Sequence, residues 1–283
     1  LSLWAKFAST GANLTLANIG PFSGDNEFRL RRDSNDRMEI YDYGSSAYKM
    51  RIRTNRLFKD TSAWYHIVVA VDTTQGSVSD RLKLYINGVQ ETSYSAETQA
   101  NSNLETAWGI AQNYTLAATE SGNYMDGEIA HFHYVDGTAH TPTTFGETDA
   151  TTGIWKPKVS PSVTYGTNGF FLKFDNSANM GLDSGGGGNN WTTNGTIIQT
   201  KSTPSNVFTT MNSLNSNPNI TYTQVNNTVN ADGGGDLRTA VSTLGATSGK
   251  YYAEAKVVSI QDAIHVGLVA ADSFAALGSN NYG

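Results

Sequence analysis

Trp64-Tyr65-His66-Ile67-Val68-Val69-Ala70-Val71-Asp72 is the stretch that decides the fold. Its odd-numbered members from Tyr65 to Val71 share one face of an extended chain, and its even-numbered members from Trp64 to Ala70 share the other. Both faces are largely apolar. Because a strand that is apolar on both faces is covered on both sides, residues 64–72 are expected to form a central strand.

The segment that follows predicts a hairpin. Between Arg81 and Asn87 the side chains alternate, with leucine or isoleucine at every even position and polar or aromatic residues between them. Asn87 and Gly88 tolerate the positive φ angles that a type I′ turn requires. Ile86 and Val89 should therefore face each other across the turn.

Strand-like alternation continues on both sides of this hairpin, and polar turns separate the runs. Such spacing is typical of a sandwich or barrel, and it favours an all-β fold, namely an antiparallel jelly-roll β-sandwich. The further strands are expected at residues 1–7, 14–19, 27–31, 37–43, 48–53, 108–111, 127–134, 169–174, 251–258 and 264–270.

The composition suits such a fold and narrows the function. The chain has 283 residues, of which 16% are charged; its net charge is −6 and it contains no cysteine. Without cysteine there is neither a disulfide nor a thiolate site. Nucleic-acid binding would need a stronger positive field, and no apolar run approaches the roughly 18 residues of a membrane-spanning helix. We therefore expect no nucleic-acid partner and no membrane insertion.

Three runs carry a family likeness, namely Ser62–Asp72, Leu82–Val89 and Tyr124–Ala130. Together they resemble the laminin-G and pentraxin-like branch of the concanavalin A-like lectin/glucanase superfamily. The likeness covers roughly residues 1–137. It implies a concanavalin-like β-sandwich at residues 1–139, in which the hairpin is scaffold and recognition belongs to the surrounding loops.

The amino-acid composition changes after the expected sandwich. Residues 140–205 are rich in Gly, Asn and Pro and are expected to form a linker or wrapping segment, which Trp155 and Trp191 anchor to a neighbouring surface. A second β region is expected at residues 206–283, where Gly249–Glu254 and Val266–Leu268 resemble the start of a SPRY domain. Because that domain would be truncated and residue 1 is Leu, we expect the chain to be an interior piece of a longer polypeptide.

A second series of motifs is similar to the region after the lectin-like domain in bacteriophage structural and tail-fibre proteins. Its members are Tyr134–Gly137, Phe145–Glu147, Gly153–Lys158, Tyr165–Phe170 and Asp183–Thr192. The resemblance implies a non-enzymatic protein of the virion surface, such as a tail fibre, spike or capsid appendage. Its partners would be other virion proteins and a host-surface glycan. Fibre proteins are often homo-oligomers, trimers among them, but no heptad pattern fixes the symmetry here.

Two alternative functions stay open. One is a secreted or surface carbohydrate-active enzyme with a lectin-like domain, and the other is a purely architectural capsid decoration protein. Glycoside hydrolysis needs two carboxylates across the scissile bond, which hydrolases of the superfamily place as Glu-x-Asp-x-x-Glu. Glu147-Thr148-Asp149 begins that pattern, but Thr152 stands at the last position. Glu39 and Asp42 should point to opposite faces of a strand, so no catalytic residue is assigned and no enzyme is expected.

Ligand-binding residues are expected in the loops at one end of the sandwich. Trp108, Tyr114 and Tyr124 are the aromatic residues suited to stack on sugar rings, and Asn123 directly precedes Tyr124. Trp64, in contrast, is expected in the core.

Calcium is the one cofactor left open. Lectin-like sandwiches often bind it through loop oxygens, and Asp72, Asp80 and Asp126 are loop or strand-end acids. The competing interpretation is that these residues make Asx turns, which are common without any metal.

Two further motifs receive structural interpretations. His131 and His133 share one face of a strand, but a zinc site needs a third ligand, so both are expected to be half-exposed on the solvent face. The run Gly185–Gly188 lacks the Gly-Lys-Ser/Thr sequence of a phosphate-binding loop and is expected to be a turning loop.

Overall fold

The computed structural model describes residues 1–20, 26–109, 113–119, 122–216, 219–231, 238–260 and 264–270. The chain divides into two compact units, Leu1–Phe208 and Thr209–Gly283. The segment at residues 140–205, expected to be a linker or a wrapping segment, thus belongs to the first unit.

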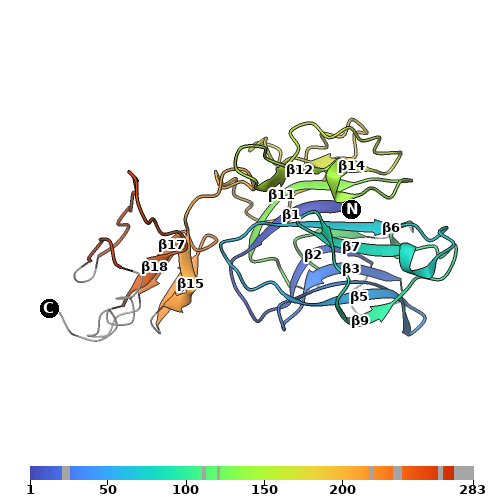
Figure 1. Cartoon of the computed structure of the whole chain (residues 1–283), viewed down its shortest axis with the longest axis horizontal. Coiled ribbons are helices and arrows are strands. Elements are labelled where there is room, and N and C mark those ends of the chain that lie inside the picture. The colour runs from blue at the N-terminus through green and yellow to red at the C-terminus, as the bar shows by residue number, and fades with distance from the viewer. Residues whose placement is uncertain are drawn as a thin grey trace. The chain divides into compact units, whose positions relative to one another are not determined.

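Two antiparallel sheets stack face to face in the first unit (Figure 1), and each has six strands in the described part of the chain. This architecture confirms the predicted all-β sandwich. Sheet A has the order β14 (Phe170–Leu172), β11 (Gly127–Tyr134), β1 (Ser2–Phe7), β6 (Tyr65–Val71), β7 (Leu82–Ile86), β8 (Val89–Gln90). Sheet B has the order β10 (Tyr114–Leu116), β2 (Leu14–Ile19), β3 (Glu27–Arg32), β4 (Arg37–Gly44), β5 (Ala47–Leu57), β9 (Tyr94–Thr98).

The core lies between the two sheets and follows from the period-2 alternation of their strands. Burying a large aliphatic side chain stabilises the fold by about 1.5–3 kcal/mol, so this one cluster carries much of the stability of the sandwich. Its buried members include Leu3, Phe7, Leu16, Ile19, Phe28, Leu30, Met38, Ile40, Ile52, Ile67, Val69, Leu84 and Ile86.

β6 is the central strand that the sequence predicts. It pairs with β1 on one side and β7 on the other. Ile67 and Val69 pack in the core between the sheets, whereas His66 and Val68 are buried on the opposite face of sheet A. Both faces of β6 are therefore covered.

The predicted hairpin joins β7 to β8. Asn87 and Gly88 have φ angles of 51° and 85°, and Ile86 pairs with Val89 across the turn. The Asn87 side chain also accepts a hydrogen bond from the backbone N–H of His66 at 2.7 Å. The turn is therefore tied to the neighbouring strand as well as to its own.

A covering segment, which we define as residues 139–191, lies on the outer face of sheet A (Figure 1). It contains a short hairpin of β12 (Gly146–Thr148) and β13 (Trp155–Pro157), and it supplies β14 to the edge of sheet A beside β11. A second buried cluster joins the segment to the sheet, with the members Val68, Val135, Phe145, Tyr165 and Phe171.

Two tryptophans anchor the covering segment, as the sequence indicates. The Trp155 indole N–H donates a hydrogen bond to His66 Nδ1 at 2.9 Å. The Trp191 ring packs against Phe170 with a centroid separation of 5.0 Å. Each tryptophan therefore holds a polar stretch of chain against the sandwich.

The expected solvent exposure of His133 is wrong. Its side chain is buried, and its ring stacks on Phe171 at a centroid distance of 3.8 Å. His131 is partly buried and takes a φ of 49°, where the register between β1 and β11 shifts. Strand alternation could not reveal this burial, because the residues that cover the strand come much later in the sequence.

The expected strand at residues 108–111 is also not formed as predicted. Ala107–Gly109 makes a 3-10 turn, η2, and residues 110–111 lie outside the described ones. The Gly185–Gly188 run, in contrast, forms the expected turning loop, with positive φ at Gly186 and Gly188.

The described part of the second unit contains two small sheets. β15 (Met211–Ser216) pairs with β18 (Ala240–Ser242), and β16 (Ile220–Thr223) pairs with β17 (Thr228–Ala231). The strands expected at residues 251–258 and 264–270 are not formed, and the side chains there are exposed. A strand needs a partner for its backbone hydrogen bonds, and alternation alone does not supply one.

No helix among the described residues has the length and apolar character needed to cross a membrane.

Candidate functional site

The outer side of sheet B is strongly polar and combines arginine with tyrosine. In its central strands the alternate residues that point away from the core are charged or aromatic, while their neighbours fill the core. We call these outer side chains the arginine face. Its members are Glu27, Arg29 and Arg31 of β3, Glu39, Tyr41 and Tyr43 of β4, and Tyr48, Arg51 and Arg53 of β5.

Glu39 is the carboxylate that two arginines of the arginine face share. Arg31 donates from Nε and Nη2 to Glu39 Oε2 at 2.8 and 2.6 Å, and Arg51 donates from Nε and Nη2 to Oε1 at 2.8 and 2.5 Å. The Glu39 side chain is 0% exposed, whereas those of Arg31 and Arg51 are 23% and 19% exposed. One buried carboxylate therefore fixes two guanidinium groups that still reach solvent.

A third arginine, Arg53, lies on the strand next to Glu39. Arg53 lies directly opposite Glu39 in the register between β4 and β5, and its Nε donates to Ser95 Oγ at 3.0 Å. It makes no ion pair with any carboxylate among the described residues. Two arginines are thus ion-paired with Glu39, and a third lies opposite it on the neighbouring strand.

Aromatic rings line the same face. The guanidinium carbons of Arg29 and Arg31 lie 5.9 and 5.6 Å from the Tyr41 ring centroid, and Tyr41 donates from its hydroxyl to Glu27. Burial raises the pKa of the Tyr41 hydroxyl above its usual range, so it stays a neutral donor.

Tyr48 is the tyrosine of the arginine face whose ring is exposed to solvent. It is 38% exposed, and the Arg51 guanidinium carbon lies 4.3 Å from its ring centroid. Tyr43 packs edge-on against it at 5.3 Å. An exposed aromatic ring next to fixed hydrogen-bond donors is an arrangement suited to a ring-shaped polar ligand.

The two carboxylates considered for hydrolysis point to opposite sides of β4, as predicted. Glu39 belongs to the arginine face, whereas Asp42 is buried toward the core and accepts a hydrogen bond from the Ala107 N–H at 2.6 Å. Burial raises the pKa of the Asp42 carboxyl, and the hydrogen bond from Ala107 opposes that shift. The two groups cannot flank one substrate bond.

The residues expected to bind a ligand are not gathered on the arginine face. Trp108 is buried in the core, where its ring lies 4.9 Å from Phe28 and 4.4 Å from Tyr134. Tyr114 is partly exposed and donates from its hydroxyl to the Trp108 carbonyl at 3.0 Å. Trp108 therefore packs as a core residue, where it cannot stack on a sugar. Trp64, expected in the core, is buried.

Asn123 and Tyr124 lie in the connection that precedes β11. The Asn123 carbonyl accepts a hydrogen bond from the Thr15 N–H at 3.2 Å. Tyr124 is 72% exposed. Of the four residues proposed from the sequence, Tyr124 is the one with a widely accessible ring.

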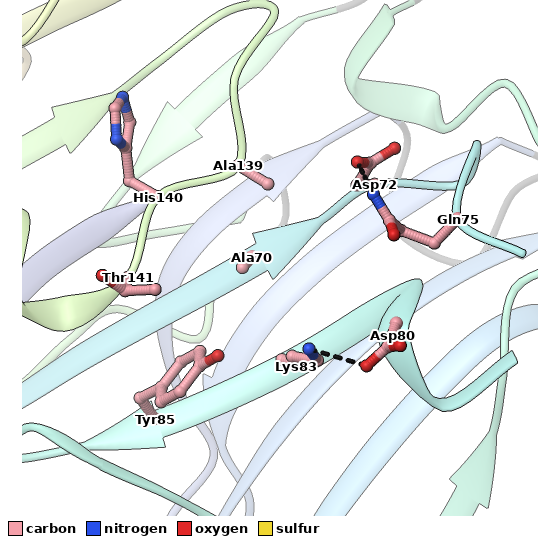
Figure 2. A pocket seen from close by; sticks show the side chains of 9 residues that line it. All are labelled: Ala70, Asp72, Gln75, Asp80, Lys83, Tyr85, Ala139, His140 and Thr141. Carbon is pink, nitrogen blue, oxygen red and sulfur yellow. Dashed lines mark hydrogen bonds and ion pairs between the residues drawn. The ribbon is translucent and has the colours of Figure 1, made fainter. Parts of the chain in front are cut away.

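Two of the three candidate calcium ligands meet at a polar pocket on the other sheet. Figure 2 shows Asp72 just after β6, Asp80 at the end of the 3-10 turn η1 (Val78–Asp80), and Tyr85 on β7. The pocket has a volume of about 250 Å³. Asp126 is exposed elsewhere, and its backbone carbonyl accepts from the Ala8 N–H.

The donors around this pocket do not fit a calcium ion. Asp72 accepts hydrogen bonds from Thr74 and from Gln75 Nε2, and these bonds lower the pKa of its carboxyl. Asp80 is paired with Lys83 Nζ at 2.7 Å, so an ammonium group already stands where a cation would be held. Among the described residues no group of three or more His, Asp or Glu side chains could hold a metal ion. The Asx-turn interpretation accounts for Asp72.

A buried histidine layer lies under the covering segment. His66 stacks on Trp4 at 4.6 Å and accepts from the Trp155 indole, so its neutral ring donates from Nε2 to Ser2 Oγ at 2.9 Å. His133 shares a hydrogen bond of 2.8 Å with the Tyr165 hydroxyl. Burial lowers the pKa of His66 to about 3 and holds the pKa of His133 well below its usual range. Both are packing groups that stay neutral.

Sequence reasoning missed the arginine face. The signal was present in the run Glu27-Phe28-Arg29-Leu30-Arg31, where charged and apolar residues alternate. Such alternation predicts a strand with one polar side. It cannot show that arginines from neighbouring strands converge on Glu39, because that depends on the register between the strands.

A comparison with known protein families agrees with the sandwich fold. Residues 1–144 match the family model described as the Concanavalin A-like lectin/glucanases superfamily, of the laminin-G type. A search of the curated proteins finds no match.

Proposed function

This chain belongs to the Concanavalin A-like lectin/glucanases superfamily, and we propose that its sandwich binds carbohydrate without cleaving it. The observation that carries the proposal is the arginine face of sheet B. There Glu39 fixes Arg31 and Arg51, and the Arg51 guanidinium lies over the partly exposed Tyr48 ring. Fixed planar donors next to an accessible aromatic ring bind sugar hydroxyls and sugar faces at little entropic cost.

The carboxylates of the arginine face support binding rather than hydrolysis. Glu27 is ion-paired with Arg29, and Glu39 is saturated by two arginines. A general acid for glycoside hydrolysis must be free to reach the leaving oxygen of the sugar. Both oxygens of Glu39 instead accept hydrogen bonds from arginines. Both glutamates are better suited to hold arginines than to transfer protons.

We propose a virion surface as the setting of this domain. The support is the motif series from Tyr134 to Thr192, which resembles the region after the lectin-like domain in phage structural and tail-fibre proteins. In this proposal the protein is a fibre, spike or capsid appendage, an assembly of several copies that contacts other virion proteins and a host-surface glycan. The part that resembles the start of a SPRY domain would add a second contact surface.

Binding to immobilised polysaccharides tests the carbohydrate function. We expect the full chain to bind at least one glycan, and Arg51→Gln and Tyr48→Ala each to weaken that binding about tenfold or more. Tyr124→Ala is the matched control, because Tyr124 is exposed but lies outside the arginine face. Loss of binding in Tyr124→Ala alone would move the site to the loops. Release of reducing sugar ends by the full chain would contradict the non-catalytic part.

Purified virus particles test the setting. Antibodies to the full chain should label the particle surface in electron micrographs and detect the protein in washed particles. Finding the protein only in the soluble fraction of infected cells would overturn the virion proposal and leave carbohydrate binding untouched.

A further inference from the structure

The arginine face concentrates positive charge in a chain whose net charge is −6. Its outer side chains include four arginines, Arg29, Arg31, Arg51 and Arg53, against the two carboxylates of Glu27 and Glu39. Around Glu39 the imbalance is sharper, because Arg31 and Arg51 share this single carboxylate and Arg53, the residue opposite, makes no ion pair with a carboxylate among the described residues. The local field therefore attracts anions although the whole chain repels them.

The arginines are held in place before any ligand arrives. Arg31 and Arg51 each use Nε and one terminal nitrogen on Glu39, which fixes the plane of each guanidinium. Arg53 is fixed through Nε by Ser95 Oγ. A guanidinium held in one plane loses little side-chain entropy when it forms further hydrogen bonds.

Fixed guanidinium forks match the geometry of planar or tetrahedral oxyanions. Arginine binds carboxylate and oxyanion groups through paired charge-assisted hydrogen bonds, which are about twice as strong as neutral ones. The Arg51 guanidinium lies over one face of the Tyr48 ring, and the exposed remainder of that ring offers an apolar surface for a sugar ring. A ligand that carries both a ring face and an anion uses every group on this surface, whereas a neutral sugar leaves the excess charge unused.

We propose that the arginine face selects an acidic saccharide, one whose rings carry carboxylate or sulfate groups. This inference rests on the proposed carbohydrate function and names its ligand class. Carboxylated and sulfated sugars share the anionic oxygen atoms that Arg31, Arg51 and Arg53 recognise.

Three glucans with the same backbone separate charge from sugar recognition. We would measure binding of the full chain to dextran, carboxymethyl-dextran and dextran sulfate at equal ionic strength. The expected result is that at least one anionic dextran binds ten times more tightly than dextran. Raising the salt concentration from about 50 to 200 mM should weaken the anionic binding severalfold and leave neutral binding unchanged.

Substitutions at Arg53 test whether the preference for anionic dextrans arises at the arginine face. Arg53→Gln removes a charge that pairs with no carboxylate among the described residues, so the fold should persist; its thermal unfolding is the check. We expect Arg53→Gln to weaken anionic binding about tenfold and Arg53→Lys to restore part of it. Lys201→Gln, which removes an exposed positive charge outside the face, should leave binding within twofold.

The outcomes separate this inference from the carbohydrate function. Equal binding of dextran and both charged forms would overturn the acidic-saccharide inference and leave carbohydrate binding standing. If the chain binds none of the three dextrans and no glycan on an array, both proposals are overturned. Binding of single-stranded DNA as tightly as dextran sulfate would show general anion attraction without sugar recognition, and it would also overturn the inference.

Discussion

The Trp155 indole N–H donates a hydrogen bond to His66 Nδ1 at 2.9 Å, and 89 positions separate the two residues in the chain. This bond ties the β13 strand of the covering segment to the central strand β6. The covering segment therefore stabilises the sandwich through specific contacts and is not a loose linker.

Trp155→Phe should destabilise the first unit by about 1–3 kcal/mol, because it leaves a buried histidine nitrogen without its donor while it keeps an aromatic ring. The unfolding free energy from urea denaturation measures the effect. Trp191→Phe is the control, since the ring contact of Trp191 with Phe170 survives that change; its cost should stay below about 1 kcal/mol. Equal effects of both variants would contradict the role of the His66 bond.

Acid should destabilise the fold through the histidine layer. Burial lowers the pKa of His66 to about 3 and holds the pKa of His133 well below its usual range, whereas an unfolded histidine titrates near 6.5. The unfolded state therefore binds more protons below about pH 6.5. Stability is full above that pH and falls by about 1.4 kcal/mol per pH unit for each histidine as the pH drops toward 3.

Urea unfolding at several pH values between 7.5 and 4.5 measures this slope. His133→Gln should lower the change of unfolding free energy per pH unit by the amount that one histidine contributes. This holds whatever the substitution does to stability at pH 7.5. His265→Gln, at an exposed position, should leave the slope unchanged. A slope that is flat over this range in the unsubstituted protein would refute the assignment.

Gly88→Ala should destabilise the β7–β8 hairpin. A non-glycine residue in left-handed backbone costs about 1–2 kcal/mol, and Gly88 has a φ of 85°. The added Cβ would also approach the Trp155 ring at 3.2 Å. Gly76→Ala is the matched control, because no atom lies within 4 Å of its added Cβ; its effect should stay within about 0.5 kcal/mol. Thermal unfolding of both variants decides the point.

Asp183→Asn should loosen the turning loop at Gly185–Gly188. Asp183 accepts backbone hydrogen bonds from Phe171 and Gly185 at Oδ1 and from Asn189 at Oδ2. An amide nitrogen cannot accept any of these bonds, so we expect a loss of about 1–3 kcal/mol.

Hydrogen exchange at residues 183–189 measures that loosening and should speed up about tenfold or more. Asp175→Asn changes an exposed carboxylate nearby in the sequence and should leave exchange in the loop unchanged. Unchanged exchange in Asp183→Asn would show that the loop holds itself by other contacts.

Much of the sandwich followed from local sequence patterns. The apolar alternation of residues 64–72 predicted a central strand covered on both sides, and Asn87-Gly88 predicted the hairpin turn. These predictions are confirmed because strand alternation and turn chemistry act over a few residues. The strands expected at residues 251–258 and 264–270 had the same alternation and did not form, since alternation cannot specify a pairing partner.

The candidate site was far less predictable. Trp108 and Tyr124 are both aromatic residues near turns, yet one is buried in the core and the other is 72% exposed. Asp72 and Asp80 do meet at one pocket, but Lys83 occupies the position a cation would need. Burial and ion pairing depend on residues that are distant in sequence, which composition and spacing do not reveal.

The sequence by itself determined the all-β class, the central strand and the hairpin, because each depends on neighbouring side chains along one strand. Only the tertiary structure decided that Arg31 and Arg51 converge on Glu39 with Arg53 on the neighbouring strand, and that the covering segment buries His66 and His133. The physical reason is register. A shift of one residue between strands would send every one of these side chains to the other face, and the energy that fixes register is spread over the whole packed core.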